Sequence, residues 1–100
     1  MIIRIFRAVV APDRQSEFET FFRDTAIPLV RAQPGLVSVT AGVPGVDAPN
    51  EFAMVMVWKD IDSLRAFAGE DWLSPHIHPD EDGIVLERHL HHYELATAHP

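Results

Sequence analysis

Residues 51–69 read EFAMVMVWKDIDSLRAFAG and predict a strand that leads directly into a helix. Side chains of a strand alternate between its two faces, and both faces are apolar here, so we expect both to be covered. Asp60 is the predicted cap of the helix, because its carboxylate can accept a hydrogen bond from a backbone amide at the helix start. Gly69 is the predicted stop, because glycine tolerates the left-handed backbone that ends many helices. The apolar stripe of this helix consists of Ile61, Leu64, Phe67 and Ala68.

Three further strands are expected at residues 2–10, 36–43 and 84–95, each of which contains several β-branched residues. Arg4 and Arg7 are the only charges of the first strand, and the alternation places them on opposite faces. One arginine is therefore expected among apolar side chains on each side of the sheet.

The other helix is expected to begin at Pro12 and Asp13, with Asp13 as its cap, and to end before Pro34. Its apolar residues recur at helical spacing and are Phe18, Phe21, Phe22, Ala26, Leu29 and Val30. Pro28 interrupts this pattern. We expect a kink or a division near Ile27, because proline lacks a backbone donor and disfavours the helical region just before it.

The order of elements is strand, helix, strand, strand, helix, strand. It predicts an α+β, ferredoxin-like βαββαβ domain over residues 1–95, with a four-stranded antiparallel sheet, both helices on one face and a frayed tail at 96–100. Residues 44–50 have the proline, glycine and asparagine residues typical of a turn, and residues 70–83 are expected to be irregular or to hold one short helical turn. The uncovered sheet face is apolar as well, so we expect a homodimer whose sheets face each other, as in a dimeric α/β barrel.

Charge and composition exclude several classes of protein. The 100 residues include eight Lys plus Arg against fifteen Asp plus Glu, for a formal charge of −7. Without a basic run, neither a nucleic-acid site nor an anionic membrane surface is expected. The chain has no cysteine, which excludes disulfides, thiolate metal sites and cysteine nucleophiles. No leader-like start and no apolar run of membrane-spanning length is present, so we expect a cytoplasmic protein.

Four segments together resemble the antibiotic biosynthesis monooxygenase family of dimeric α/β-barrel proteins. They are MIIRIFRAVV, EFETFF, PGLVSV and VMVWKDIDSLRAFA, and the resemblance extends over roughly residues 2–94. The segment FAGEDWLSPHIHPDEDGIVLERHLHHYE is similar to a branch with an FAG-acid motif, a Pro-acid-acid motif and a terminal His-Tyr.

The resemblance implies oxygenation of a small aromatic or polyphenolic compound to a quinone, with neither metal nor flavin as cofactor. It also implies that a tryptophan at a strand end lines the pocket between sheet and helices, and Trp58 matches that position. Taken alone, Trp58 could equally be a large core residue. Relatives that degrade haem carry an Asn on the first strand and a His in or after the second helix, whereas residues 2–10 hold no Asn and 60–70 no His.

His76 and His78 are candidate bases, because imidazole is suited to abstracting a phenolic proton near neutral pH. In extended backbone the two side chains would face the same way and could begin a metal site with oxygen ligands from Asp80, Glu81 or Asp82. The simpler interpretation is a loop histidine bonded to backbone or water, beside an acidic run that forms a solvated turn or a helix start. We therefore expect no metal.

The last strand places His89, His91 and Tyr93 on one face and Leu90 and His92 on the other. Hydrogen bonds within the sheet or across a dimer are the favoured role of these imidazoles. His92 and Tyr93 remain candidates for catalysis and substrate binding respectively, since the branch resemblance includes them.

Arg4 is a candidate anchor for a phenolate or carboxylate. The structural alternative, which we favour, is that Arg4 or Arg7 pairs with a carboxylate such as Glu94 across the sheet. The remaining residues expected to line a substrate pocket are Phe6, Phe22, Met54, Met56, Phe67 and Trp72.

Three functions remain open on the sequence. The first is a cofactor-independent monooxygenase, with catalytic candidates Trp58, His76, His78 and His92. The second is a non-catalytic dimeric module that binds a small ligand or regulates a partner. The third is a haem-binding or haem-degrading protein.

Overall fold

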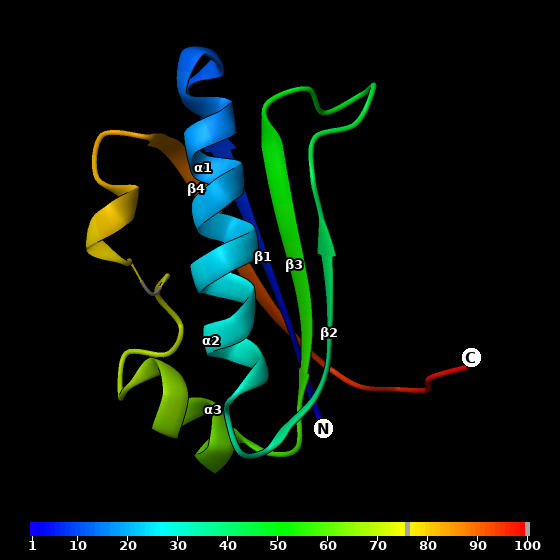
Figure 1. The fold of residues 1–100 in the computed structure, drawn as a ribbon. Coiled ribbons are helices and arrows are strands. Elements are labelled where there is room, and N and C mark those ends of the chain that lie inside the picture. Colours follow the sequence, from blue (N-terminus) through cyan, green and yellow to red (C-terminus); the bar gives the residue numbers. More distant parts are fainter. Residues whose placement is uncertain (76, 100) are drawn as a thin grey trace.

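Four antiparallel strands form one layer of the molecule and the helices form a second layer against it (Figure 1). The computed structural model describes residues 1–75 and 77–99. The strands are β1 (Ile2–Val10), β2 (Leu36–Gly42), β3 (Glu51–Trp58) and β4 (Val85–Glu94). Their order in the sheet is β2-β3-β1-β4. This is the ferredoxin-like arrangement, so the predicted α+β fold is confirmed.

The first helix is built from four consecutive segments. They are η1 (Pro12–Arg14), α1 (Gln15–Phe21), η2 (Phe22–Ala26) and α2 (Ile27–Arg31). Segment η2 is a π-helical turn, in which the amide of Ile27 donates to the carbonyl oxygen of Phe22. The wider turn comes directly before Pro28, as expected for a residue that cannot donate to the preceding turn. The irregularity lies where it was predicted, but Asp13 is not the cap, because it lies inside η1 and Ala11 holds that position.

The second helix, α3 (Ile61–Ala68), begins and ends as predicted. The Asp60 carboxylate accepts from the backbone amide of Ser63 at 2.8 Å. Hydrogen bonding to Ser63, first to its side chain and then to its backbone, lowers the pKa of Asp60. Gly69 follows the helix with φ of 88°. A further short turn, η3 (Pro79–Glu81), precedes β4. In the part of the chain that the structure describes, no helix is long and apolar enough to cross a bilayer.

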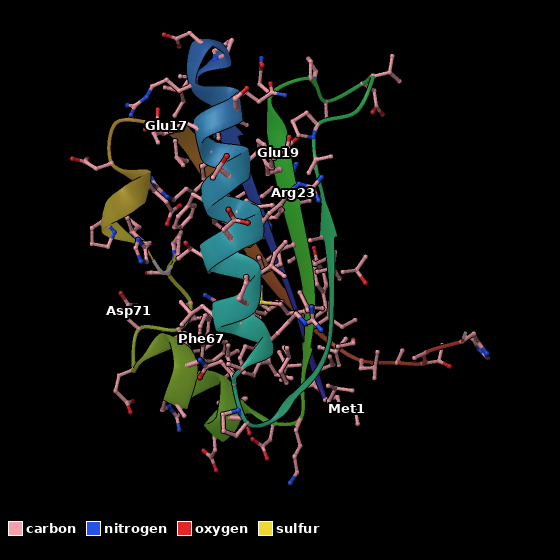
Figure 2. All side chains as sticks on the ribbon, viewed as in Figure 1. Met1, Glu17, Glu19, Arg23, Phe67 and Asp71 are labelled. Atoms are coloured by element: carbon pink, nitrogen blue, oxygen red, sulfur yellow. The ribbon has the colours of Figure 1, made fainter. Side chains whose placement is uncertain are left out.

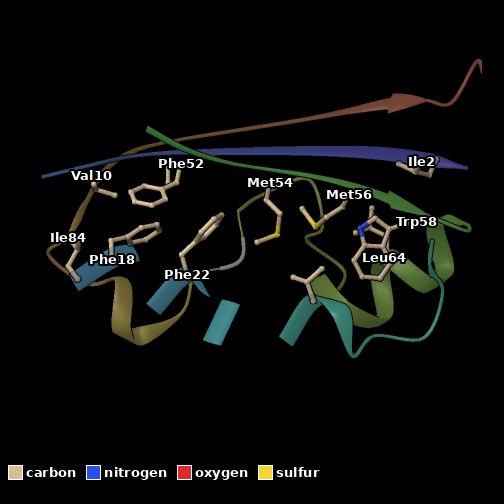
Figure 3. Packing of buried hydrophobic residues seen from close by; sticks show 12 residues of the cluster. Ile2, Val10, Phe18, Phe22, Phe52, Met54, Met56, Trp58, Leu64 and Ile84 are labelled. Atoms are coloured by element: carbon tan, nitrogen blue, oxygen red, sulfur yellow. The ribbon is translucent and has the colours of Figure 1, made fainter. Parts of the chain in front are cut away.

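The register of the sheet assigns each strand residue to one of two faces. Arg4 lies opposite Met56 on β3 and opposite His92 on β4, so these three side chains share the face that the helices cover. The hydrophobic core lies between this face and the helices (Figure 3). Its largest fully buried side chains are Trp58, Phe18, Phe52, Leu64, Ile84 and Val10.

The outer face of the sheet is also apolar at its centre. Ile5 on β1 lies opposite Val55 on β3, and Ile3 lies opposite Val57. No helix covers this side in the described chain, and Val55 remains 37% exposed. Each face of the sheet therefore needs a cover, as the sequence predicts, but the single chain supplies only one.

Candidate functional site

A cavity of about 70 Å³ lies between the helix-facing side of the sheet and the first helix. Its apolar wall consists of Phe6, Phe18, Phe21, Phe22, Ala26, Leu29, Val30, Met54, Met56 and Phe67. The cavity reaches the surface at Leu29, which is 41% exposed. Three polar residues complete the wall, namely Arg4, His78 and Glu81.

The first helix turns its charged side away from this cavity. Glu19 and Arg23 form an ion pair of 3.0 Å between Oε2 and Nε, and Figure 2 shows both along the helix in front of the sheet. The opposite side carries Phe18 and Phe22, which are almost fully buried. Phe22 lies beside Met54 below β3 (Figure 3). The same amphipathic pattern that builds the core therefore also builds the apolar wall.

The size of the cavity limits what it holds without rearrangement. An engineered protein cavity of about 150 Å³ binds one benzene molecule, so about 70 Å³ is less than one aromatic ring requires. Met54 and Met56 line the cavity, and methionine side chains are unbranched and adapt to a ligand more readily than branched ones. A single ring is accordingly the largest aromatic unit that modest repacking of this wall would admit.

Arg4 is the most unusual residue of the site, because it is a cation with only 3% of its surface exposed. Its Nη1 donates to the carbonyl oxygen of Trp72 at 2.6 Å and to Nε2 of His92 at 2.9 Å. Among the side chains that the structure describes, which do not include that of Asp80, no carboxylate oxygen lies within 4 Å of this guanidinium. Burial lowers the pKa of Arg4 to about 10.

The favoured structural interpretation of the two arginines therefore holds for only one of them. Arg7 pairs with a carboxylate, but with Glu51 rather than Glu94, at 3.1 Å between Nη1 and Oε2. Glu94 lies opposite Ile2 at the end of β4, on the same face as Arg4 but two residues beyond His92, which is the direct neighbour of Arg4. The two acceptors that hold Arg4 are both uncharged.

His92 is held as a neutral acceptor beside Arg4. Burial, and after it the positive charges of Arg4 and His91, lower the pKa of His92. Only a neutral imidazole can accept through Nε2, which agrees with its contact to Arg4 Nη1. The ring of Trp72 packs edge-on against His92, with 5.0 Å between ring centroids. His92 and Trp72 thus position Arg4 from behind the cavity wall.

His78 and Glu81 form the second polar part of the wall. The backbone amide of His78 donates to Oε2 of Glu81 at 2.7 Å, and the His78 ring lies 5.1 Å from that of Phe21. Glu81 is only 4% exposed, and its Oε1 lies 3.8 Å from Nε of Arg88. Of the two predicted alternatives for the acidic run, a solvated turn or a helix start, Glu81 therefore follows the second, because it is buried and lies in η3. Pro79 at the first position and Glu81 at the third match a capping box, which is the signal that could have placed this carboxylate.

Trp58 and Tyr93, two further predicted site residues, do not line the cavity. Trp58 is fully buried and stacks on Phe67 at 5.2 Å between centroids, so Phe67 stands between the indole and the cavity. The indole Nε1 has no hydrogen-bond partner among the described residues. Tyr93 lies opposite Ile3 on the outer face and is 53% exposed. His76 lies outside the described residues.

Metal ligands do not gather in the described part of the chain. No group of three or more His, Asp or Glu side chains there is placed to hold an ion. The predicted alternative began with His76 and His78, and one of its possible oxygen ligands, Glu81, already accepts from the His78 amide and faces Arg88.

Comparison with known proteins identifies the family. The family model for antibiotic biosynthesis monooxygenases matches residues 1–73. The chain belongs to this family. The family resemblance predicted from the sequence is therefore confirmed. Among curated protein sequences, none matches it.

Solved structures support the same assignment of fold for this family member. SnoaB from Streptomyces nogalater, a cofactor-independent oxygenase solved as an alanine variant, is 25% identical with a TM-score of 0.69, covering 99% of this chain and 96% of that one. A Deinococcus radiodurans protein that carries the family's name is 11% identical with a TM-score of 0.77, covering 100% and 97%. A Pseudomonas aeruginosa protein is 20% identical with a TM-score of 0.74, covering 95% and 94%.

Proposed function

We propose that the protein is a cofactor-independent monooxygenase that acts on a small phenolic compound in the cavity below β3. The observation that carries the proposal is Arg4, a buried guanidinium on an apolar wall that also bears the His78 imidazole. A positive charge there favours an anion in a space from which bulk water is largely excluded. Membership of the family, and the likeness to an oxygenase over nearly the whole chain, support the reaction class.

The chemistry assigned to the chain's residues is limited to protons and charge. The His78 imidazole accepts the phenolic proton as general base, and the charge of Arg4 favours the resulting anion. The electron-rich anion then reduces O₂, and one oxygen atom becomes bonded to a ring carbon as a hydroperoxide. Cleavage of the O–O bond, with loss of the proton from that carbon, releases water. In sum, phenol and O₂ give quinone and water, and the substrate supplies all four electrons.

Oxygen uptake tests this proposal directly. Monocyclic hydroquinones, naphthols and anthrones would be offered to the protein in air, with chelator present and no metal or flavin added. We expect uptake with the smallest members and a loss of about 100- to 10,000-fold in kcat for His78→Gln, the usual contribution of a general base. Arg7→Met, on the other face of β1, is the control and should keep wild-type activity. No uptake across the panel would overturn the proposal.

A non-catalytic ligand-binding module is the second candidate, and the small cavity favours it. The cavity wall consists largely of Phe and Met side chains, which leave little open volume, and Trp58 lies behind Phe67. Thermal stabilisation by a phenolic ligand without any product would support this function instead. The cavity volume gives no support to the haem alternative, because a porphyrin is far larger than one ring; a haem titration without a Soret shift would remove it.

We also propose a homodimer formed through the outer face of the sheet. An apolar strip there contains Ile3, Ile5, Val55 and Val57. Val55 within this strip and Tyr93 beside it remain partly exposed, as expected of a surface that a second copy covers. Light scattering on the eluting protein should give the dimer mass for wild type and the monomer mass for Val55→Glu. Lys59→Glu, at an exposed position beyond the end of β3, is the control; a wild-type monomer would overturn the assignment.

A further inference from the structure

The guanidinium of Arg4 uses only one of its three nitrogens within the described chain. Nη1 makes both hydrogen bonds, one to the Trp72 carbonyl and one to His92 Nε2. These two acceptors account for both hydrogens of Nη1. Among the described residues, Nε and Nη2 have no acceptor. An arginine presents its donors as a rigid planar fork, so the edge formed by Nε and Nη2 remains available.

Unlike Arg4, the other two arginines of the sheet each have a carboxylate within 4 Å. Arg7 has Glu51 at 3.1 Å, and Arg88 has Glu81 at 3.8 Å. The chain has a formal charge of −7 and is therefore rich in carboxylates. Among the sheet arginines that the structure describes, Arg4 nevertheless has no carboxylate partner. Burying a cation without an opposite charge is unfavourable, and the cation is retained here by two neutral acceptors. An anion that accepts from Nε and Nη2 would supply the opposite charge that the described residues do not bring to Arg4.

We propose that the cavity binds a monocyclic aromatic carboxylate, whose two carboxylate oxygens accept from Nε and Nη2 of Arg4 while the ring lies among the Phe and Met side chains. This proposal deepens the proposed function, because it names the substrate class of the same cavity. A carboxylate matches the planar fork with two oxygens, whereas a phenolate offers only one. The small volume restricts the ligand to one ring. A hydroxylated benzoate combines the carboxylate for Arg4 with a phenolic group for His78.

Calorimetric titration under anaerobic conditions tests binding separately from turnover. The probes are benzoate, its neutral isostere benzamide, and phenol. For wild type, we expect benzoate to bind about tenfold or more tightly than benzamide. Arg4→Met should abolish that preference, and Arg4→Lys, which keeps the charge but not the fork, should weaken benzoate binding about tenfold. Arg7→Met should behave as wild type.

Two binding outcomes would overturn the inference. One is equal affinity of wild type for benzoate and benzamide, and the other is a preference for benzoate that survives Arg4→Met. Arg4→Lys keeps the experiment decisive if Arg4→Met does not fold.

Turnover distinguishes the failure of this inference from failure of the proposed function. If benzoate binds through Arg4 but dihydroxybenzoates consume no oxygen, the substrate class stands and the oxygenase activity fails. If hydroquinone without a carboxylate is consumed with the same kcat/KM as the dihydroxybenzoates, the oxygenase stands and the carboxylate inference is overturned. Faster consumption of the dihydroxybenzoates, lost in Arg4→Lys, would support both.

Discussion

The two arginines of β1 lie on the same strand but in opposite environments. Arg7 points to the outer face, where its side chain is 44% exposed and pairs with Glu51. Arg4 points to the helix face, where it is 3% exposed and is held by a carbonyl and a neutral imidazole. The difference teaches that one strand can carry an exposed arginine matched by a carboxylate of the protein and a buried arginine that has only neutral acceptors. The ligand that we propose would supply the opposite charge for the buried one.

The largest expected effect on stability comes from comparing a residue on each of the two faces of β3. Phe52→Ala should lower the free energy of unfolding by about 3–5 kcal/mol, because Phe52 is fully buried against Phe18 and Phe22. Val55→Ala, on the outer face, should lower the free energy of unfolding by about 1 kcal/mol or less, a value that counts only the area of Val55 buried within a single chain. Urea unfolding of both variants measures the two losses. A loss at Val55 as large as that at Phe52 would show that the outer face is as deeply buried as the core.

A smaller effect is expected from replacing each arginine by a residue of similar length. Arg4→Met should not destabilise the protein and should stabilise it by up to about 1–4 kcal/mol, since it removes an uncompensated buried cation from an apolar wall. Arg7→Met should change stability by about 1 kcal/mol or less, as for an exposed ion pair. Urea unfolding compares both with wild type. A marked loss for Arg4→Met would mean that the cation is structural rather than kept for a ligand.

The smallest expected effect concerns pH and the residue behind Arg4. The pKa of His92 is lowered in the folded protein, so near and below its ordinary value of about 6.5 the unfolded chain binds more protons. Stability contributed by neutral His92 is therefore complete above that pH and falls as the pH falls through the window down to the folded pKa. His92→Gln keeps an acceptor for Arg4 without titrating. Melting temperatures between pH 4.5 and 7.5 should decline less steeply for this variant, and parallel curves would contradict the assignment.

Much of the fold could be predicted because its signals are local. Asp60 and Gly69 delimit α3 through contacts within one or two turns. The irregular turn before Pro28 was predictable in place but not in kind. A missing donor shows where a helix must adjust, whereas the choice of a π-turn depends on which side chains of the neighbouring turns have to reach the core.

The candidate site was less predictable because its contacts span the chain. The burial of Arg4 depends on the cover provided by the first helix and on a carbonyl at Trp72, 68 positions away. Similarly, the sequence indicates a tryptophan at the end of β3 but not that Phe67 would stack over it. Alternation along β1 and β4 was sufficient to place Arg4 and His92 on one face. It could not show that they would touch.

The match of the family model ends at residue 73, within the site. Arg4 and the apolar wall belong to the matched segment, while His78, Glu81 and His92 come after it. The groups proposed to handle the proton and to position Arg4 therefore come from the last quarter of the chain, which contributes the edge strand β4 beside β1. Exchanging that quarter with the corresponding segment of a relative would keep Arg4 and the apolar wall while replacing the groups around them.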